Sequence, residues 1–323
     1  MIHVVAGVMM DAAGRVLLAQ RPPGKHLAGL WEFPGGKLEP GEQPGSGLIR
    51  ELQEELGVTV EVAEPLIRVP WQYDGRYLLL DAWMVRRWEG EVASLEGQAL
   101  QWLAPSAVDP TMLAPADRPI LQALLLPSRY PITPADLVPD AFATCVEMLR
   151  DALVHGERLI QLRLPLWPVL LVRKLAAELV PLARQLGATL VLNSDVEGAC
   201  ELGQGVGVQL RASQLMVLKA RPLSLSQLVG ASCHDVAELA CAASLGADFA
   251  TLSPVAATTS HPDAAPMGWE AFQRLVEAAS LPVYALGGMQ AADTVQASAL
   301  GGQGVAGIRG FWGAGFRRRS RLP

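Results

Sequence analysis

An acidic segment bounded by glycines, residues 36–58, constrains this 323-residue chain more than any other stretch. Its first part contains Pro40-Gly41, a dipeptide typical of turns, so we expect a loop there. From about Pro44 the pattern becomes helical, because apolar residues recur at helical spacing. These residues are Leu48, Ile49, Leu52 and Leu56. Gly57 then suits a left-handed cap, so the segment predicts a loop followed by one amphipathic helix.

Three glutamates of the predicted helix share one face, because Glu51, Glu54 and Glu55 stand at positions i, i+3 and i+4. Glu42 precedes them in the loop. Such oxygen donors suit Mg²⁺, which takes one or two carboxylates and leaves its other positions to water and substrate phosphates. A solvated acidic face is the other meaning of such a cluster. The fixed spacing, the adjacent Arg50 and the flanking glycines favour the metal site.

Residues 36–58 match every specified position of the Nudix box, Gly-x5-Glu-x7-Arg-Glu-apolar-x-Glu-Glu-x-Gly-apolar. The chain therefore resembles the Nudix hydrolases, which cleave a nucleoside diphosphate linked to another group and use Mg²⁺ or Mn²⁺. Further motifs resemble the MutT branch: Glu32-Phe33-Pro34-Gly35-Gly36-Lys37, Trp88-Glu89-Gly90-Glu91, Glu96-Gly97-Gln98, and Pro115-Ala116 with Pro119. This resemblance covers nearly all of residues 1–127. It implies an 8-oxo-dGTP diphosphatase, a hydrolase that converts oxidised purine nucleotides to the monophosphate and pyrophosphate and so serves DNA repair.

The resemblance also implies roles for individual residues. The expected metal ligands are a backbone carbonyl of Gly35 or Gly36 and the carboxylates of Glu51, Glu54, Glu55 and Glu96. The expected catalytic residues are Arg50, Glu51, Glu54, Glu55 and Glu96. The expected substrate contacts are Arg21, His26, Phe33, Pro34, Gly35, Gly36 and Asp117. The general base stays open among Glu51, Glu54 and Glu96, and Arg50 has a structural alternative because it can pair with Glu54 at i+4.

Asp117 departs from the MutT pattern, which has an Asn at this position to read the base edge. An amide both donates and accepts hydrogen bonds, whereas an ionised carboxylate only accepts them. Asp117 either accepts from an oxidised purine or indicates a different base preference. A cap on the following helix is the structural alternative, and both interpretations stay open.

The rest of the first half reads as a mixed sheet with a second helix. Residues 4–10 and 15–20 are expected to pair as strands around a turn at residues 11–14. Further strands are expected at residues 58–61, 66–71, 77–86 and 100–102, and a helix at residues 116–126. The expected fold is an α/β/α sandwich.

Prolines 127, 131, 134 and 139 mark a boundary near residue 128, beyond which strand and helix patterns alternate. Eight short strands are expected at residues 130–133, 159–164, 189–193, 207–210, 228–232, 249–254, 282–287 and 304–310. Most are separated by amphipathic stretches such as residues 169–186 and 235–245. This alternation predicts that residues 128–323 form a compact TIM-type (β/α)8 barrel.

The barrel pattern resembles thiamine phosphate synthase and its relative TenI. The matching motifs are Gln161-Leu162-Arg163, Asn193, Gly207-Val208-Gln209-Leu210, Ser253-Pro254-Val255 and Ala285-Leu286-Gly287-Gly288. Several charged positions of the synthase differ here: Pro165 and His261 replace lysines, and Ser194 and Gln214 replace acidic metal ligands. Without those counter-charges for metal and diphosphate, thiamine synthesis is not expected. A docking module, a sensor of a phosphorylated ligand that Gly287-Gly288 could hold, and an enzyme of altered chemistry remain open.

The composition of the chain limits the classes of partner and the cell compartment that are expected. The net charge of −6 gives no reason to expect a nucleic-acid polymer, and the basic tail at Arg317, Arg318, Arg319 and Arg321 is expected to be a solubilising terminus. The four cysteines lack zinc-site spacing, and no apolar run approaches membrane-spanning length, so a cytoplasmic protein is expected.

The expected protein is thus a Mg²⁺-dependent pyrophosphohydrolase acting on small nucleotides, fused to a barrel without synthase activity. An alternative keeps the Nudix reaction but acts on a thiamine-related diphosphate. A third makes the barrel a regulatory or scaffolding module.

Overall fold

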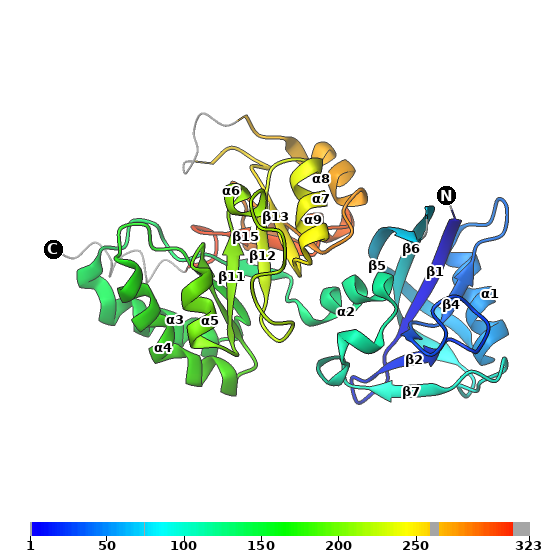
Figure 1. The fold of residues 1–323 in the computed structure, drawn as a ribbon. Helices are drawn as coiled ribbons and strands as arrows, with labels where there is room; N and C mark the ends of the chain where they lie inside the picture. Colours follow the sequence, from blue (N-terminus) through cyan, green and yellow to red (C-terminus); the bar gives the residue numbers. More distant parts are fainter. Residues whose placement is uncertain (1, 74, 259–264, 313–323) are drawn as a thin grey trace. The chain divides into compact units, whose positions relative to one another are not determined.

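The computed structural model describes residues 2–73, 75–258 and 265–312. It divides into two compact units, Met1–Leu125 and Leu126–Pro323, which are described separately (Figure 1). The basic tail and His261 lie outside the described residues. Within the described residues, every helix is too short or too polar to cross a lipid bilayer.

The first unit contains two helices and two small sheets among its described residues. Its strands are β1 (Ile2–Met9), β2 (Val16–Gln20), β3 (Trp31–Glu32), β4 (Gly35–Lys37), β5 (Thr59–Tyr73), β6 (Arg76–Glu89) and β7 (Leu100–Leu103). Its helices are α1 (Pro44–Leu56) and α2 (Arg118–Leu125), with 3₁₀ turns η1 (Pro105–Ala107), η2 (Pro110–Met112) and η3 (Pro115–Asp117). The strands run in the orders β4-β1-β6-β5 and β3-β2-β7.

The expected pairing of the first two strands is wrong beyond the turn itself. Gly14 N donates to Asp11 O at 2.9 Å, and one bridge joins Met10 to Val16. The two strands then enter different sheets, since β1 pairs in parallel with β6 and β2 pairs with β3 and β7. The strands expected at residues 58–61 and 66–71 are one long strand, β5, whose register shifts let it bend.

The larger sheet is covered on both faces, which confirms the expected sandwich. Alternate residues of β1 point to opposite sides, as strand geometry requires. Val5 and Met9 pack with Leu48 and Leu52 of α1, whereas Ala6 and Val8 belong to the core under α2 that contains Ile120 and Leu121. Figure 1 shows α1 and α2 on either side of β1 and β6.

Helix α1 follows the predicted bounds closely. Pro44 occupies its first turn, and Gly57 ends it in the left-handed conformation (φ 72°) while donating its N–H to Gln53 O. Leu48, Leu52 and Leu56 are fully buried, but Ile49 is 43% exposed and lies outside the packed stripe. The buried face fixes how α1 sits on the sheet, and therefore where its glutamates point.

The second unit alternates strands and helices. Its strands are β8 (Arg129–Pro131), β9 (Leu159–Leu162), β10 (Thr189–Asn193), β11 (Val206–Leu210), β12 (Val229–Cys233), β13 (Phe249–Leu252), β14 (Val283–Ala285) and β15 (Gly304–Gly307). Its helices are α3 (Phe142–Val154), α4 (Val169–Gln185), α5 (Val196–Leu202), α6 (Ala212–Leu215), α7 (Val236–Leu245), α8 (Gly268–Glu277) and α9 (Thr294–Ala299), with 3₁₀ turns η4 (Pro139–Ala141) and η5 (Ala291–Asp293).

Eight parallel strands of the described residues form the expected barrel, in the order β8-β15-β14-β13-β12-β11-β10-β9. A parallel bridge between Ile132 and Gln161 joins the two end strands, so the sheet nearly closes on itself. Each observed strand overlaps an expected one, although several end two or three residues earlier than expected.

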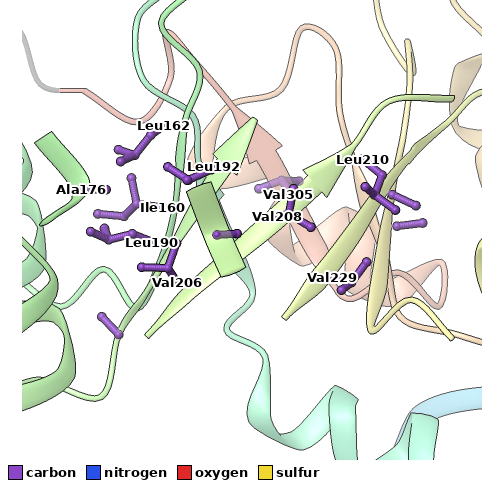
Figure 2. Packing of buried hydrophobic residues seen from close by; sticks show 14 of the residues in the cluster. Ile160, Leu162, Ala176, Leu190, Leu192, Val206, Val208, Leu210, Val229 and Val305 are labelled. Carbon is purple, nitrogen blue, oxygen red and sulfur yellow. The ribbon is translucent and has the colours of Figure 1, made fainter. Parts of the chain in front are cut away.

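Two hydrophobic layers hold this barrel together. Outward residues such as Ile160 and Leu190 pack against α4 residues including Ala176, as Figure 2 shows. Inside, Tyr130 and Phe249 pack edge to face with ring centroids 5.3 Å apart, and Tyr284 joins them. These rings fill the interior, so the barrel is a packed core, not a pore.

Candidate functional site

Arg50 of α1 binds the carboxylates that the acidic segment brings together. Its Nε and Nη2 donate to the two carboxylate oxygens of Glu42 at 3.0 and 2.9 Å. Its Nη1 donates to Glu51 at 2.9 Å and to Glu54 at 3.1 Å. Nη2 also donates to the Lys37 carbonyl at 3.1 Å. The structure therefore contains the ion pair on which the structural alternative for Arg50 depends. The guanidinium connects α1 to the preceding loop and orients two glutamates.

Gly35 and Gly36 of β4 let the backbone approach those glutamates. A Cβ on Gly36 would stand 2.0 Å from Glu51 Oε2, so only glycine fits against that carboxylate. A Cβ on Gly35, whose φ is 151°, would stand 2.1 Å from the Val5 carbonyl. The Gly35 N–H donates to Glu55 Oε2 at 3.1 Å. Two carboxylates of α1 therefore face the double glycine.

Glu55 is partly buried within this cluster. Burial raises the pKa of its carboxyl to about 7, and the charges of Glu96, Glu32 and Glu51 act in the same direction. The hydrogen bond from Gly35 opposes this shift. Because neighbouring negative charges act on the buried Glu55 carboxyl, added positive charge is favourable at this place.

The chemistry of these donors fits a hard divalent cation. All the side-chain donors are carboxylate oxygens, and the double glycine leaves room for a backbone carbonyl beside them. Within residues 2–73, 75–258 and 265–312, no three His, Cys, Asp or Glu side chains already stand as a ready-made metal cluster. Glu51 and Glu54 instead bind Arg50, so the metal-ligand assignment stays a prediction.

Asp117 lies buried at the end of η3, with 5% of its surface exposed. Its Oδ1 accepts a hydrogen bond from Phe33 N at 2.9 Å, so this oxygen holds the backbone next to the double glycine. Burial raises the pKa of Asp117 to about 8, against the opposing effect of the Phe33 N–H. The Asp117 carboxyl is therefore mostly protonated at neutral pH and then offers both a donor and an acceptor.

The remaining expected substrate contacts gather around Tyr73, at the end of β5. The His26 ring packs edge-on against Tyr73 with centroids 5.3 Å apart, and Tyr73 Oη accepts from Ala116 N at 3.0 Å. Arg21 Nε donates to the His26 carbonyl at 2.7 Å. The structure thus connects Arg21 and His26 with the segment that carries Asp117.

Glu96 and Pro34 complete the expected set. Glu96, between β6 and β7, stands 3.5 Å from Lys25 Nζ and contributes to the field at Glu55. The Pro34 carbonyl accepts from Gly7 N at 2.7 Å and pins the loop to β1. The Pro34 carbonyl thus has a structural role.

Three residues of this site were not predicted. Glu32 pairs with Arg21, and burial raises the pKa of its carboxyl. Its place in the motif before the double glycine was a usable signal. No sequence signal pointed to Lys25 or Tyr73, because their roles arise from contacts between segments far apart in sequence.

The barrel has a separate pocket of about 980 Å³ at the carboxyl ends of its strands. Gly287 and Gly288 line it with positive φ angles of 100° and 70°. A Cβ on Gly288 would stand 2.7 Å from the Ala257 carbonyl, so glycine is required for packing there. His234 also lines the pocket, and its Nδ1 lies 2.9 Å from Glu238.

Comparison with known proteins finds a matching family for each half of the chain. The NUDIX domain family matches residues 5–123, and the thiamine monophosphate synthase family matches residues 129–311. The CTP pyrophosphohydrolase of Escherichia coli (strain K12) is 44% identical over 125 residues, which cover 39% of this chain and 92% of that protein. The 8-oxo-dGTP diphosphatase of the same organism is 32% identical over 123 residues, covering 38% of this chain and 95% of that protein.

A third relative matches the barrel. The putative thiamine-phosphate synthase 2 of Aquifex aeolicus (strain VF5) is 32% identical over 186 residues, which cover 58% of this chain and 98% of that protein. The synthase family match spans more than half of the chain, and the Nudix relatives are covered over nearly their whole length. The chain therefore belongs to the Nudix family through residues 5–123 and to the thiamine monophosphate synthase family through residues 129–311.

Proposed function

We propose that residues 1–127 form a Mg²⁺-dependent nucleoside triphosphate pyrophosphohydrolase and that residues 128–323 form a barrel without synthase activity. The observation that carries this proposal is the packing of the α1 glutamates against the double glycine. Glu51 lies against Gly36, and Glu55 accepts from Gly35 N. The reaction adds water to a phosphorus atom and breaks its bond to the bridging oxygen, giving the monophosphate and pyrophosphate.

The chain's own groups have distinct tasks in this reaction. When bound, Mg²⁺ supplies the positive charge that a polyphosphate needs before a water can attack it. Arg50 holds Glu51 and Glu54 in place before substrate arrives. Glu51, Glu54 and Glu96 remain the candidates for the base that removes a proton from the attacking water.

The proposed substrate is an oxidised purine triphosphate such as 8-oxo-dGTP, so that the enzyme sanitises the nucleotide pool. The MutT-type motifs around the site and the likeness to 8-oxo-dGTP diphosphatases support this choice. Asp117 and the Phe33 backbone form a buried hydrogen-bonding edge suited to reading a base.

A second candidate substrate is a cytidine triphosphate. Greater identity to a CTP pyrophosphohydrolase than to the Escherichia coli 8-oxo-dGTP diphosphatase favours it. Steady-state assays of the full chain with 8-oxo-dGTP, dGTP, CTP and thiamine diphosphate rank these choices by kcat/KM. Activity on thiamine diphosphate alone would refute both nucleotide assignments.

The Asp117→Asn variant tests whether Asp117 recognises the base of the nucleotide. We expect the ratio of kcat/KM for 8-oxo-dGTP to that for CTP to change about tenfold or more, the scale of one buried hydrogen bond. In the wild type this ratio should also shift between pH 6.5 and pH 9.5, because Asp117 loses its donor as pH rises through about 8. The Asn variant should show no such shift.

Using a ratio removes titrations that affect both substrates equally, such as that of Glu55. A ratio that is unchanged by the substitution and flat with pH would show that Asp117 does not contact the base.

A further inference from the structure

Lys25 stands at the tip of the loop that connects β2 to β3. The two ends of this loop are held together, because Arg21 N donates to the Leu30 carbonyl at 2.9 Å and Gly29 N donates to the Arg21 carbonyl at 3.0 Å. The Lys25 N–H closes a turn at the tip by donating to the Pro22 carbonyl at 3.3 Å. The backbone therefore fixes where the Lys25 side chain begins, while that side chain is 56% exposed and can change its partner.

Glu96 faces Lys25 from a second loop, which is tied to α1. Leu95 N donates to the Glu55 carbonyl at 3.0 Å, and Gln98 Nε2 donates to the same carbonyl at 3.4 Å. These contacts hold Glu96 near Glu55, and the charge of Glu96 adds to the effect of burial in raising the pKa of the Glu55 carboxyl. Lys25 Nζ lies 3.5 Å from Glu96 Oε2, so the two loops meet at the edge of the carboxylate cluster.

Lys25 is held less firmly than the two arginines that border the same carboxylates. The Arg50 guanidinium donates to three carboxylates and to a backbone carbonyl at distances between 2.9 and 3.1 Å. Arg21 pairs with Glu32 and also donates to a backbone carbonyl. Burial raises the pKa of Glu32, and the charges of Arg21 and Lys25 oppose this rise. Of the three cations, Lys25 therefore loses the fewest contacts within the protein when it binds a substrate.

The ion pair between Lys25 and Glu96 is of a kind that exchanges easily. The two side chains are 56% and 50% exposed, and their N···O distance of 3.5 Å is longer than that of a strong charge-assisted hydrogen bond. Exposed pairs add little to stability, because water solvates both charges and pairing costs the side chains their freedom. If Glu96 holds a cation, the ammonium group of Lys25 loses its partner, and the phosphates of a nucleotide then offer it a more highly charged one.

We propose that Lys25 exchanges partners during binding: it pairs with Glu96 in the empty protein and with a phosphate of the nucleotide once Glu96 is engaged by Mg²⁺. This inference rests on the proposed function and adds a substrate-binding residue to it. It gives Lys25 two effects of opposite sign, because an ammonium group beside Glu96 repels a metal ion and attracts a polyphosphate. Removing the ammonium group should therefore strengthen metal binding and weaken nucleotide binding.

The Lys25→Gln variant of the full chain tests this opposition. Binding of Mn²⁺ without nucleotide is measured by electron paramagnetic resonance, and KM and kcat are measured for CTP and 8-oxo-dGTP at saturating Mg²⁺. We expect the Kd of Mn²⁺ to fall about twofold to fivefold, the scale of one solvent-screened charge. We expect KM to rise about fivefold or more, the scale of one partly exposed hydrogen bond to a charged group. Because the phosphate contact forms on binding, KM should change more than kcat.

Two further variants serve as controls. Lys25→Arg keeps the positive charge, so its Kd for Mn²⁺ and its KM should stay close to those of the wild type. Arg86→Gln is the matched control: Arg86 is 57% exposed and its Nε lies 3.6 Å from Glu64 Oε2, so this variant removes the same charge and a similar ion pair outside the site. It should leave both values unchanged. Circular dichroism confirms that each variant is folded.

The possible failures are distinguishable. A Kd of Mn²⁺ that is unchanged or raised in Lys25→Gln would show that Lys25 does not compete with a metal for Glu96. An unchanged KM for both nucleotides, in a variant that still hydrolyses them with Mg²⁺, would refute this inference and leave the proposed function intact. If the wild-type chain hydrolysed neither nucleotide with Mg²⁺, the proposed function would be refuted, and this inference with it.

Discussion

Replacing Glu54 or Glu55 by glutamine is expected to lower kcat for nucleoside triphosphate hydrolysis by about a hundredfold or more, the scale on which loss of a general base or an essential carboxylate acts. The amide keeps the size of the side chain but removes the negative charge that would hold a cation. Glu54 is 59% exposed, so its replacement should cost little stability. Rates are measured at saturating Mg²⁺ and substrate.

Glu39→Gln is the matched control for these variants. Glu39 lies in the same loop and is exposed, and its contacts with Glu42 are made by its backbone, whose N–H donates to the Glu42 carboxylate and whose carbonyl accepts from Glu42 N. It should retain wild-type turnover. If both the Glu54 and Glu55 variants showed near-normal Mg²⁺-dependent rates, α1 would not be the catalytic helix.

Gly35→Ala is expected to destabilise the first unit by roughly 3 kcal/mol, because two costs combine. The new Cβ would stand 2.1 Å from the Val5 carbonyl, and a φ of 151° is rarely adopted by residues with a side chain. The backbone must then move, and the hydrogen bond from Gly35 N to Glu55 is lost with it. We expect turnover to fall together with the urea midpoint of unfolding.

Gly45→Ala provides the comparison for this second prediction. Gly45 lies in the first turn of α1, and the nearest atom to a new Cβ is 4.0 Å away on Trp83. Since Ala is the better helix former, stability should stay the same or rise by up to about 1 kcal/mol. Equal urea midpoints for Gly35→Ala and the wild type would contradict the steric argument.

Local signals predicted α1 almost to the residue, because everything that defines it is nearby in sequence. Pro44 starts the helix, the leucine stripe buries it and Gly57 ends it. Ile49 shows the limit of this reasoning: an apolar residue beside the stripe extends the pattern without being packed. The spacing of apolar residues shows which side chains a helix could bury, whereas the sheet that the helix packs against decides which of them are buried.

The pairing of strands that lie far apart in the chain could not be predicted from the sequence. β1 lies beside β6, with Val5 opposite Asp81, and no local pattern distinguishes this arrangement from a hairpin with β2. The same limit applies to the site. The motif identified the glutamates and glycines, but the roles of Glu32 and Tyr73 depend on loops that meet only after folding. Likewise, Arg163, Arg211 and Arg309 come to line one pocket only because the barrel brings the ends of distant strands together.

The hydrogen bond between Gln214 and Ser194 has a consequence for any attempt to build a metal site at this place in the barrel. A glutamate at position 214 could still accept from Arg211 N, but it has no N–H to donate to the Ser194 carbonyl. Each added carboxylate oxygen would therefore face a carbonyl oxygen that has lost its donor, and the loop after β10 would lose one of the contacts that hold it.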